Sequence, residues 1–273
     1  MTILSRQPAI IFLTSLILPL VSILFSLNAD AAEKEKALKA VAKGEPRLVQ
    51  IKAKKDDDFL LFADYYLGGK RSGGAIVLHD CKSDRRAYRS VAKDLAQQGL
   101  HTLLVDLRGY GDSISAVYSR EEAQKKSSDI VSFQNEMTLI TANWADDLLA
   151  MYQFLAKKID KSKGIAVVAS GCSSAYAVSL AERIQLNAMV MITPQMTYGE
   201  KERYKNLVDI PSYFITSSHH QNSYEIAQEL FSWNGAKQSK MQIFKGDRYD
   251  SQLISRQKYL DHDISLWVKF NLR

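Results

Sequence analysis

The sequence predicts an α/β protein built on a doubly wound, mostly parallel sheet. Short apolar runs typical of buried parallel strands alternate with segments of helical periodicity along most of the chain. Two extended segments separated by an Asp-rich turn precede them, which predicts an antiparallel hairpin at the start of the sheet. Without an N-terminal leader, roughly 240 residues remain, a length that one α/β domain can fill.

The leader, residues 1–32, has the features of an export signal. Arg6 precedes an apolar run from Ala9 to Leu27, and Ala29-Asp30-Ala31 offers the small residues at which a signal peptidase cuts. The apolar run is longer than the roughly 7–15 residues of a usual signal core, so an uncleaved membrane anchor is the alternative. Either way the domain is expected outside the cytoplasm, periplasmic or secreted, with membrane contact only if the segment is retained.

Composition and charge limit the partners and cofactors that are expected for the folded domain. Residues 33–46 predict a charged linker and residues 47–273 the folded domain, with an ordinary globular content of 46% hydrophobic and 24% charged residues. The net charge of +6 comes from scattered lysines without an aromatic-basic cluster, so no nucleic-acid partner is expected. No phosphate-binding glycine motif and no metal-ligand spacing occurs, so neither a cofactor nor a metal is expected.

The strands are expected where apolar residues cluster. The hairpin is formed by Leu48–Lys55 and Phe59–Leu67, with a turn at Asp56–Asp58. The wholly apolar run Ala75–Leu78 predicts a buried strand, and buried strands are also predicted at Thr102–Val105 and Ile165–Ala169. Further strands are predicted at Ala188–Ile192, Ser212–Ile215 and Met241–Phe244. Such sheets place their sites at the carboxyl ends of the strands, so the turns after these strands are where function is expected.

Helices are expected between the strands. Apolar residues at helical spacing, and stop signals such as Gly99, predict helices at Arg85–Gln98, Trp144–Leu155, Ser174–Arg183, Tyr224–Trp233 and Lys258–Phe270. The polar stretch Ser119–Asn143 predicts a loop with a short helix that would rise beside the site.

Six segments in this order resemble the α/β-hydrolase superfamily, nearest to its compact dienelactone-hydrolase-like and esterase-like members. The turn Asp106–Ser113 (DLRGYGDS) is the most specific. The other five are Leu78–Asp80, Trp144–Asp147, Ile165–Ala181, Ile210–Thr216 and Gly246–Asp250. The resemblance covers the chain from Leu48 onward and implies the hydrolase sheet, with no large lid because the gap from Pro194 to Pro211 is short.

The resemblance also implies three catalytic positions, none of which holds the usual residue. The strand-to-helix elbow carries the nucleophile, and the alignment puts Gly171 at its apex. His220 stands where the acid is expected, and Tyr249 where the catalytic histidine is expected. Glycine cannot attack, histidine cannot supply a carboxylate's charge, and a phenol is a poor base near neutral pH.

A second alignment remains open. Gly171-Cys172-Ser173-Ser174-Ala175 fits a G-x-S-x-A elbow with Ser173 as nucleophile, and His219 as a displaced base. This alternative describes a serine esterase. The first alignment describes a non-catalytic relative that binds a small molecule or an envelope protein at the old active-site cleft. A structural or assembly protein of the envelope is a third reading.

The chain has two cysteines, and both fall in the segments that would form the oxyanion hole. Cys81 follows His79 and Asp80 in one loop, and Cys172 follows the elbow apex in the other. Because the fold brings these loops side by side, a Cys81–Cys172 disulfide is the hypothesis. Two buried free thiols, or Cys172 as a cysteine nucleophile, are the alternatives.

Overall fold

The structure is a computed structural model that describes residues 45–54, 57–160 and 162–272. The leader expected at 1–32 and nearly all of the expected linker lie outside these residues, as does part of the hairpin turn. Within the described residues, no helix combines the length and the apolar character that a membrane crossing requires.

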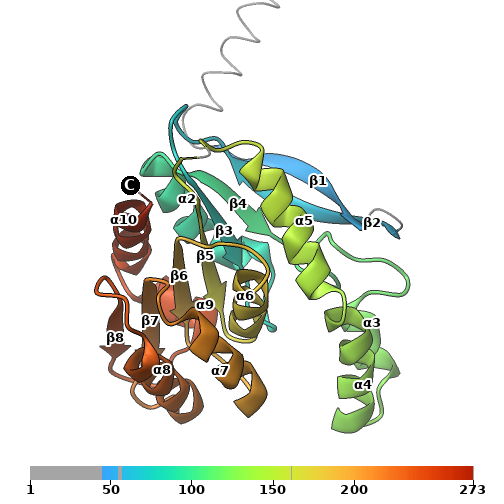
Figure 1. Ribbon diagram of the computed structural model, residues 1–273. Helices are drawn as coiled ribbons and strands as arrows, with labels where there is room; N and C mark the ends of the chain where they lie inside the picture. Colours follow the sequence, from blue (N-terminus) through green and yellow to red (C-terminus); the bar gives the residue numbers. More distant parts are fainter. Residues whose placement is uncertain (1–44, 55–56, 161, 273) are drawn as a thin grey trace, which may run out of the picture. The chain divides into compact units, whose positions relative to one another are not determined.

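An eight-stranded sheet forms the centre of the domain, in the order β1-β2-β4-β3-β5-β6-β7-β8 (Figure 1). The strands β3 to β8 run parallel, whereas β2 pairs antiparallel with both β1 and β4. This confirms the predicted mostly parallel sheet led by a hairpin. The strands are β1 Arg47–Lys54, β2 Asp57–Tyr66, β3 Gly74–Leu78, β4 His101–Val105, β5 Ile165–Ser170, β6 Ala188–Ile192, β7 Ser212–Ser217 and β8 Lys240–Phe244.

The direction in which successive strands are added to the sheet reverses between β3 and β5. The chain passes from β3 to β4 on one side, and the later strands add successively on the other side of β3. In doubly wound sheets, the crevice at such a switch point is where ligands bind, just beyond the carboxyl ends of the strands. The loops after Leu78 and Ser170 are therefore the ones that the topology brings to the candidate site.

Helices cover both faces of the sheet. Side chains alternate along β3, so that Ile76 and Leu78 belong to one apolar core and Ala75 and Val77 to the other. The first core packs against α5 (Trp144–Ala156), α6 (Ser173–Ala181) and α8 (Gln221–Trp233). The second packs against α2 (Arg89–Gln97), α9 (Asp250–Arg256) and α10 (Leu260–Asn271).

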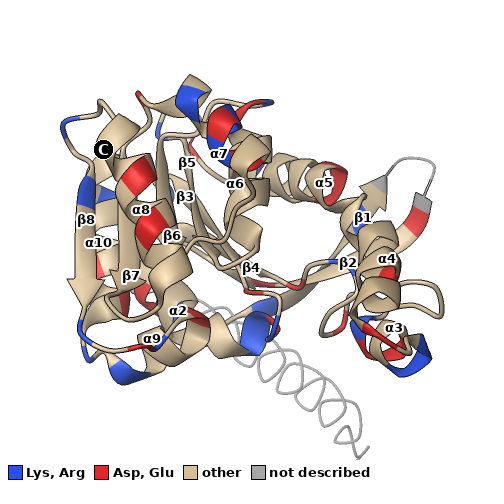
Figure 2. Ribbon diagram, turned by 90° about the horizontal axis from the view of Figure 1, so that it is seen from below, with Lys and Arg blue, Asp and Glu red and all other residues tan. Residues whose placement is uncertain are grey.

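The polar insert differs from the expectation. Instead of a loop with a short helix, it contains α3 (Arg120–Lys126) and α4 (Ile130–Thr141), which form an arm beside the body of the domain (Figures 1 and 2). The hydroxyl of Ser119 and the carboxylate of Asp129 cap the two helices by accepting hydrogen bonds from their first turns. Strong caps thus define helices that apolar periodicity marks only weakly.

Short helices account for the other differences. A 3-10 turn, η1 (Arg85–Tyr88), opens the helix expected at Arg85–Gln98. The segment from Pro194 to Pro211 contains α7 (Tyr198–Tyr204) and the 3-10 turn η2 (Lys205–Leu207), and α9 precedes the closing helix. Each has seven residues or fewer, too short for a helical period to show in the sequence.

Candidate functional site

A sharp turn joins β5 to α6 at the carboxyl edge of the sheet. Gly171 lies at its apex with a φ of +54°, and Cys172 follows as the N-cap of α6. The left-handed backbone at position 171 favours glycine. A Cβ built at Gly171 would lie 2.8 Å from Oδ1 of Asp250, too close for a side chain without movement. The position that the first alignment makes the nucleophile is therefore a glycine facing a carboxylate.

Ser173 is fully buried in the first turn of α6. Its hydroxyl donates a hydrogen bond to the carbonyl oxygen of Ser170 at 2.9 Å and accepts one from the amide of Ser170 at 3.0 Å. This hydroxyl is thus used to hold the end of β5. The neighbouring hydroxyl of Ser174 is also buried and has no hydrogen-bond partner among the described residues.

Asp250 occupies the space under the elbow. Its carboxylate accepts hydrogen bonds from the hydroxyls of Thr193, at 2.6 Å, and Ser170, at 3.2 Å, and its amide donates to the same Thr193 oxygen. Burial, helped by the nearby charge of Asp80, raises the pKa of Asp250 to about 6. Asp250 stands where the family has a glycine, so the resemblance assigns it no role. An acidic residue directly after the expected base was the only signal in the sequence.

The loop after β3 is organised by a second buried carboxylate. Asp80 accepts hydrogen bonds from the amide of Lys82 and from the hydroxyls of Ser83 and Tyr88 at 2.6–2.7 Å. His79 is also buried, with Nδ1 2.6 Å from the carbonyl oxygen of Asp80 and Nε2 accepting from the amide of Leu107. Burial is the main cause that lowers the pKa of His79. A neutral imidazole with both nitrogens engaged supports the loop and is not free to act as a base.

The Cys81–Cys172 disulfide is present, with the two Cα atoms 5.9 Å apart. It joins the loop after β3 to the elbow after β5, which are the two loops at the switch point of the sheet. The predicted disulfide is thus confirmed. The alternatives of free thiols and of a Cys172 nucleophile are wrong, since both cysteines of the chain are bonded to each other.

The residues at the expected acid and base positions contact each other. The rings of His220 and Tyr249 stack with centroids 4.6 Å apart, and Nδ1 of His220 lies 2.7 Å from the hydroxyl of Ser223. Lys82 donates from Nζ to the Tyr249 hydroxyl at 2.9 Å. Partial burial and the charge of Lys82 lower the pKa of His220.

His219, the alternative base, has a different environment. Its side chain is exposed, and its amide donates to the carbonyl oxygen of Gly246. Because Ser173 is buried within the elbow, the structure does not bring an accessible Ser173 hydroxyl to the His219 ring. Across the described ranges, no group of three His, Cys, Asp or Glu side chains is placed to hold a metal ion.

A cavity of about 370 Å³ opens beside the disulfide. Trp144 of α5 and Tyr176 of α6 form an edge-to-face pair there, with ring centroids 4.8 Å apart. Thr141, at the end of the α3–α4 arm, contributes to the wall, as the position of the insert suggested. The remaining lining residues are Cys81, Cys172, Ala175, Gln195, Met196, Thr197, Glu200 and Asn222. Aromatic and sulfur-containing side chains line this cavity, and polar groups lie among them.

Solved structures of esterases and hydrolases share this architecture. The esterase Pf2001 of Pyrococcus furiosus has 18% sequence identity and a TM-score of 0.58, covering 85% of this chain and 95% of that chain. Dienelactone hydrolase from Anabaena variabilis has 14% identity and a TM-score of 0.62, covering 85% and 100%. A thermophilic esterase from Thermogutta terrifontis has 12% identity and a TM-score of 0.53, covering 83% and 100%.

These similarities establish the fold class. The described part of the chain has the α/β-hydrolase fold, as the six sequence segments indicated. No protein-family model matches the sequence, and no curated protein matches it significantly. At identities of 12–18% the shared feature is the fold, so the chemistry has to be argued from the site itself.

Proposed function

We propose that this chain is an exported, non-catalytic relative of the α/β-hydrolases that binds a small apolar molecule, or an apolar group of an envelope protein, in the cleft beside its disulfide. One observation carries the proposal. Gly171 lies at the elbow apex, and the Asp250 carboxylate fills the space that a nucleophile would use. Removing a single member of a catalytic triad already costs several orders of magnitude in rate.

The surroundings of the elbow support the same conclusion. The side chains that flank the oxyanion position are joined in the Cys81–Cys172 disulfide, and Tyr249 and His220 form a stacked pair instead of a base and its acid. The disulfide also supports export, because such bonds persist mainly in oxidising compartments. The cavity of about 370 Å³ falls within the usual size range of small-molecule sites.

Labelling with a fluorophosphonate probe, read by intact mass, tests the loss of catalysis. The protein is expected to acquire no adduct under conditions in which an active esterase of the same fold labels stoichiometrically. A stoichiometric adduct on any serine at the elbow would overturn the proposal.

Binding in the cleft is tested with an uncharged hydrophobic dye such as Nile red. Met196 lines the cavity, so Met196→Arg is expected to weaken dye binding by placing a charge in the apolar wall. The matched control is Leu266→Arg, at a 45% exposed position on α10 that packs on the other face of the sheet. Equal dye binding by wild type and Met196→Arg would rule out this cleft as the site.

A serine esterase is the second candidate, because the structural relatives include several esterases. In that function Ser173 attacks the ester and His219 is its base, which requires α6 to unwind at its first turn. Hydrolysis of a p-nitrophenyl ester that is lost in both Ser173→Ala and His219→Ala, with folding retained, would favour the esterase.

A further inference from the structure

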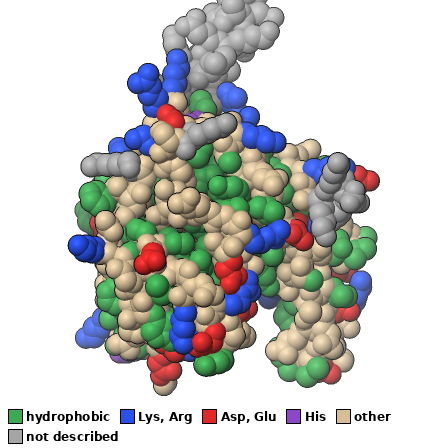
Figure 3. Space-filling model, viewed as in Figure 1, with side chains coloured by type: hydrophobic (Ala, Val, Ile, Leu, Met, Phe, Trp, Pro, Cys, Tyr) green, Lys and Arg blue, Asp and Glu red, His purple; other side chains and the backbone are tan. Residues whose placement is uncertain are grey.

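Cationic side chains gather at the end of the sheet opposite the cleft. They come from the start of β1, the loop between β2 and β3, the segment between α5 and β5, and the end of α10. Blue side chains accordingly cluster at the upper end of the molecule in Figure 3, where β1 begins. We call this set the basic edge: Arg47, Lys70, Arg71, Lys157, Lys158, Lys163 and Lys269.

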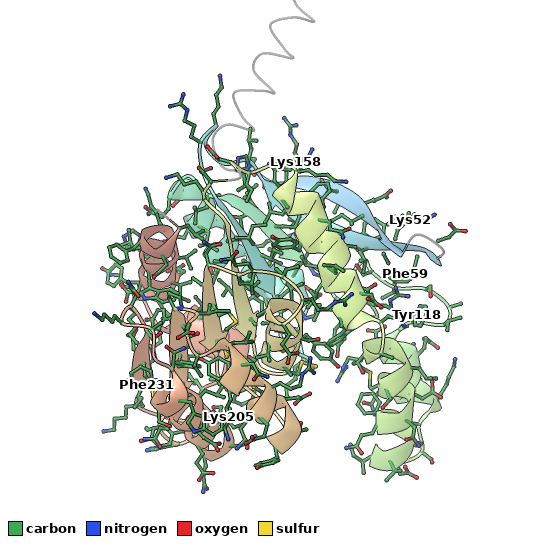
Figure 4. The ribbon with its side chains drawn as sticks, viewed as in Figure 1. Lys52, Phe59, Tyr118, Lys158, Lys205 and Phe231 are labelled. Carbon is green, nitrogen blue, oxygen red and sulfur yellow. A yellow bond between two sulfur atoms is a disulfide. The ribbon has the colours of Figure 1, made fainter. Side chains whose placement is uncertain are left out.

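Backbone hydrogen bonds hold these segments together. The amide of Asp160 donates to the carbonyl oxygen of Ser72 at 3.0 Å, and the amide of Gly74 donates to that of Gly164 at 3.1 Å. The loop before β3 and the loop before β5 therefore lie side by side. Lys158 extends from the end of α5 at the same edge, with Nζ 5.4 Å from the ring centroid of Phe154 (Figure 4).

Three of the cations surround one hollow of about 130 Å³. Arg71, Lys163 and Lys269 line it together with Gln98, whose side-chain amide can donate hydrogen bonds, and Ser72, whose hydroxyl donates to the carbonyl oxygen of Gly69. Among the described residues, no carboxylate forms a salt bridge with any of these three cations. A hollow in which cations converge without forming a salt bridge suits a phosphate-bearing group.

Acidic groups do not balance this charge. Asp160 lies between the cations, but its carboxylate accepts hydrogen bonds from the amide and hydroxyl of Ser162. Those bonds, and more weakly the charges of Lys163 and Arg71, lower the pKa of Asp160. Glu45 and Asp160 are the acids on these described segments, against seven cations of the basic edge.

We propose that the basic edge docks on an anionic lipid bilayer and that the hollow between Arg71, Lys163 and Lys269 accepts a phosphate-bearing lipid headgroup. The connection of the chain selects a bilayer over other polyanions. Residues 28–46 join the apolar run Ala9–Leu27 to Arg47, which is itself part of the basic edge. An edge docked in this way turns the cleft, at the opposite end of the strands, away from the lipid. The inference does not depend on whether the cleft is catalytic.

Co-sedimentation of the full-length chain with preformed vesicles tests whether the basic edge docks on anionic lipid. Vesicles of phosphatidylcholine alone are compared with vesicles containing about 30 mol% phosphatidylglycerol, at about 0.1 M and about 0.5 M salt. The partition coefficient is expected to be higher on the anionic vesicles and to fall at high salt. Insertion of the apolar run alone would give equal partitioning on both vesicles and would overturn the proposal.

A charge-removal variant locates the surface. Arg71→Gln, Lys163→Gln and Lys269→Gln together are expected to lower partitioning on anionic vesicles on the order of 100-fold, because each cation near such a surface contributes about 1 kcal/mol. The matched control, Lys126→Gln, Lys245→Gln and Arg256→Gln, removes the same charge away from the basic edge. Equal losses in the two variants, or tighter binding to a DNA duplex than to the vesicles, would contradict a lipid-docking edge.

Discussion

The carboxylate of Asp250 lies directly beneath Gly171, at the point where a side chain on the elbow would begin. The 2.8 Å between Asp250 Oδ1 and a Cβ built at residue 171 is shorter than real Cβ contacts allow. Both residues have positive φ angles, +54° at Gly171 and +51° at Asp250. The two positions are thus matched: the absence of a side chain at one makes room for the carboxylate at the other.

This pairing predicts that introducing a serine at the elbow destabilises the fold. Gly171→Ser should lower the free energy of unfolding by about 2 kcal/mol or more, because it adds left-handed strain to the clash with Asp250. Asp250→Gly should relieve part of this cost, with a coupling energy on the order of 1 kcal/mol in a double-mutant cycle. Urea denaturation of the wild type, the two single variants and the double variant measures this coupling energy. Strictly additive effects would show that the two residues do not compete for space.

The raised pKa of Asp250 predicts a pH dependence of stability. Its pKa is about 6 in the fold against an ordinary value of 3.8, so the folded state binds the proton more tightly. This group therefore stabilises the fold below pH 4, and its contribution is lost as the pH rises through 6, by about 3 kcal/mol in total.

Asp250→Asn isolates that contribution. The amide oxygen can still accept from Thr193 and Ser170, but the side chain no longer titrates. The difference in unfolding free energy between wild type and Asp250→Asn, measured from pH 4 to pH 7.5, should increasingly favour the variant. A difference that stays constant over this range would show that Asp250 titrates normally.

The disulfide predicts a stability loss on reduction. Cys81 and Cys172 are 91 residues apart, and closing a loop of that length is worth about 4–5 kcal/mol in the chain-entropy description. Cys81→Ala with Cys172→Ala should lower the melting temperature about as much as reduction does. Thiol titration of the denatured, unreduced protein should find no free thiol. Two titratable thiols would show that the bond does not form.

The buried hydroxyl of Ser173 predicts a purely structural effect of its removal. Ser173→Ala deletes one donor and leaves the amide of Ser170 without its acceptor, at a cost of about 1–3 kcal/mol. Ser179→Ala, at a half-buried position on the same helix, should cost much less. Thermal melts compare the two variants. A loss of fluorophosphonate labelling in Ser173→Ala without a change in stability would instead identify a nucleophile.

Most strands of the sheet can be predicted from the sequence, but few of the contacts at the candidate site can. The apolar runs from Ala75 to Ile215 identify the parallel strands β3 to β7, because burial on both faces favours nearly continuous apolar residues. The disulfide was predictable because the topology brings the loops after β3 and β5 together. The position of Asp250 was not, since it depends on a left-handed residue and on how closely two turns approach. The helices α3 and α4 were missed because their stability depends on caps more than on an apolar stripe.

The bond between Cys81 and Cys172 makes a closed ring of the chain that includes η1, α2, β4, the arm, α5 and β5. The floor of the cleft is where this ring closes, whereas α3 and α4 lie midway around it. Residues can therefore be inserted into or removed from the arm without loosening the closure. One wall of the cleft is free to vary in length and chemistry over a covalently fixed base. In the proposed binding function, the ligand could therefore change while the base of the cleft stays the same.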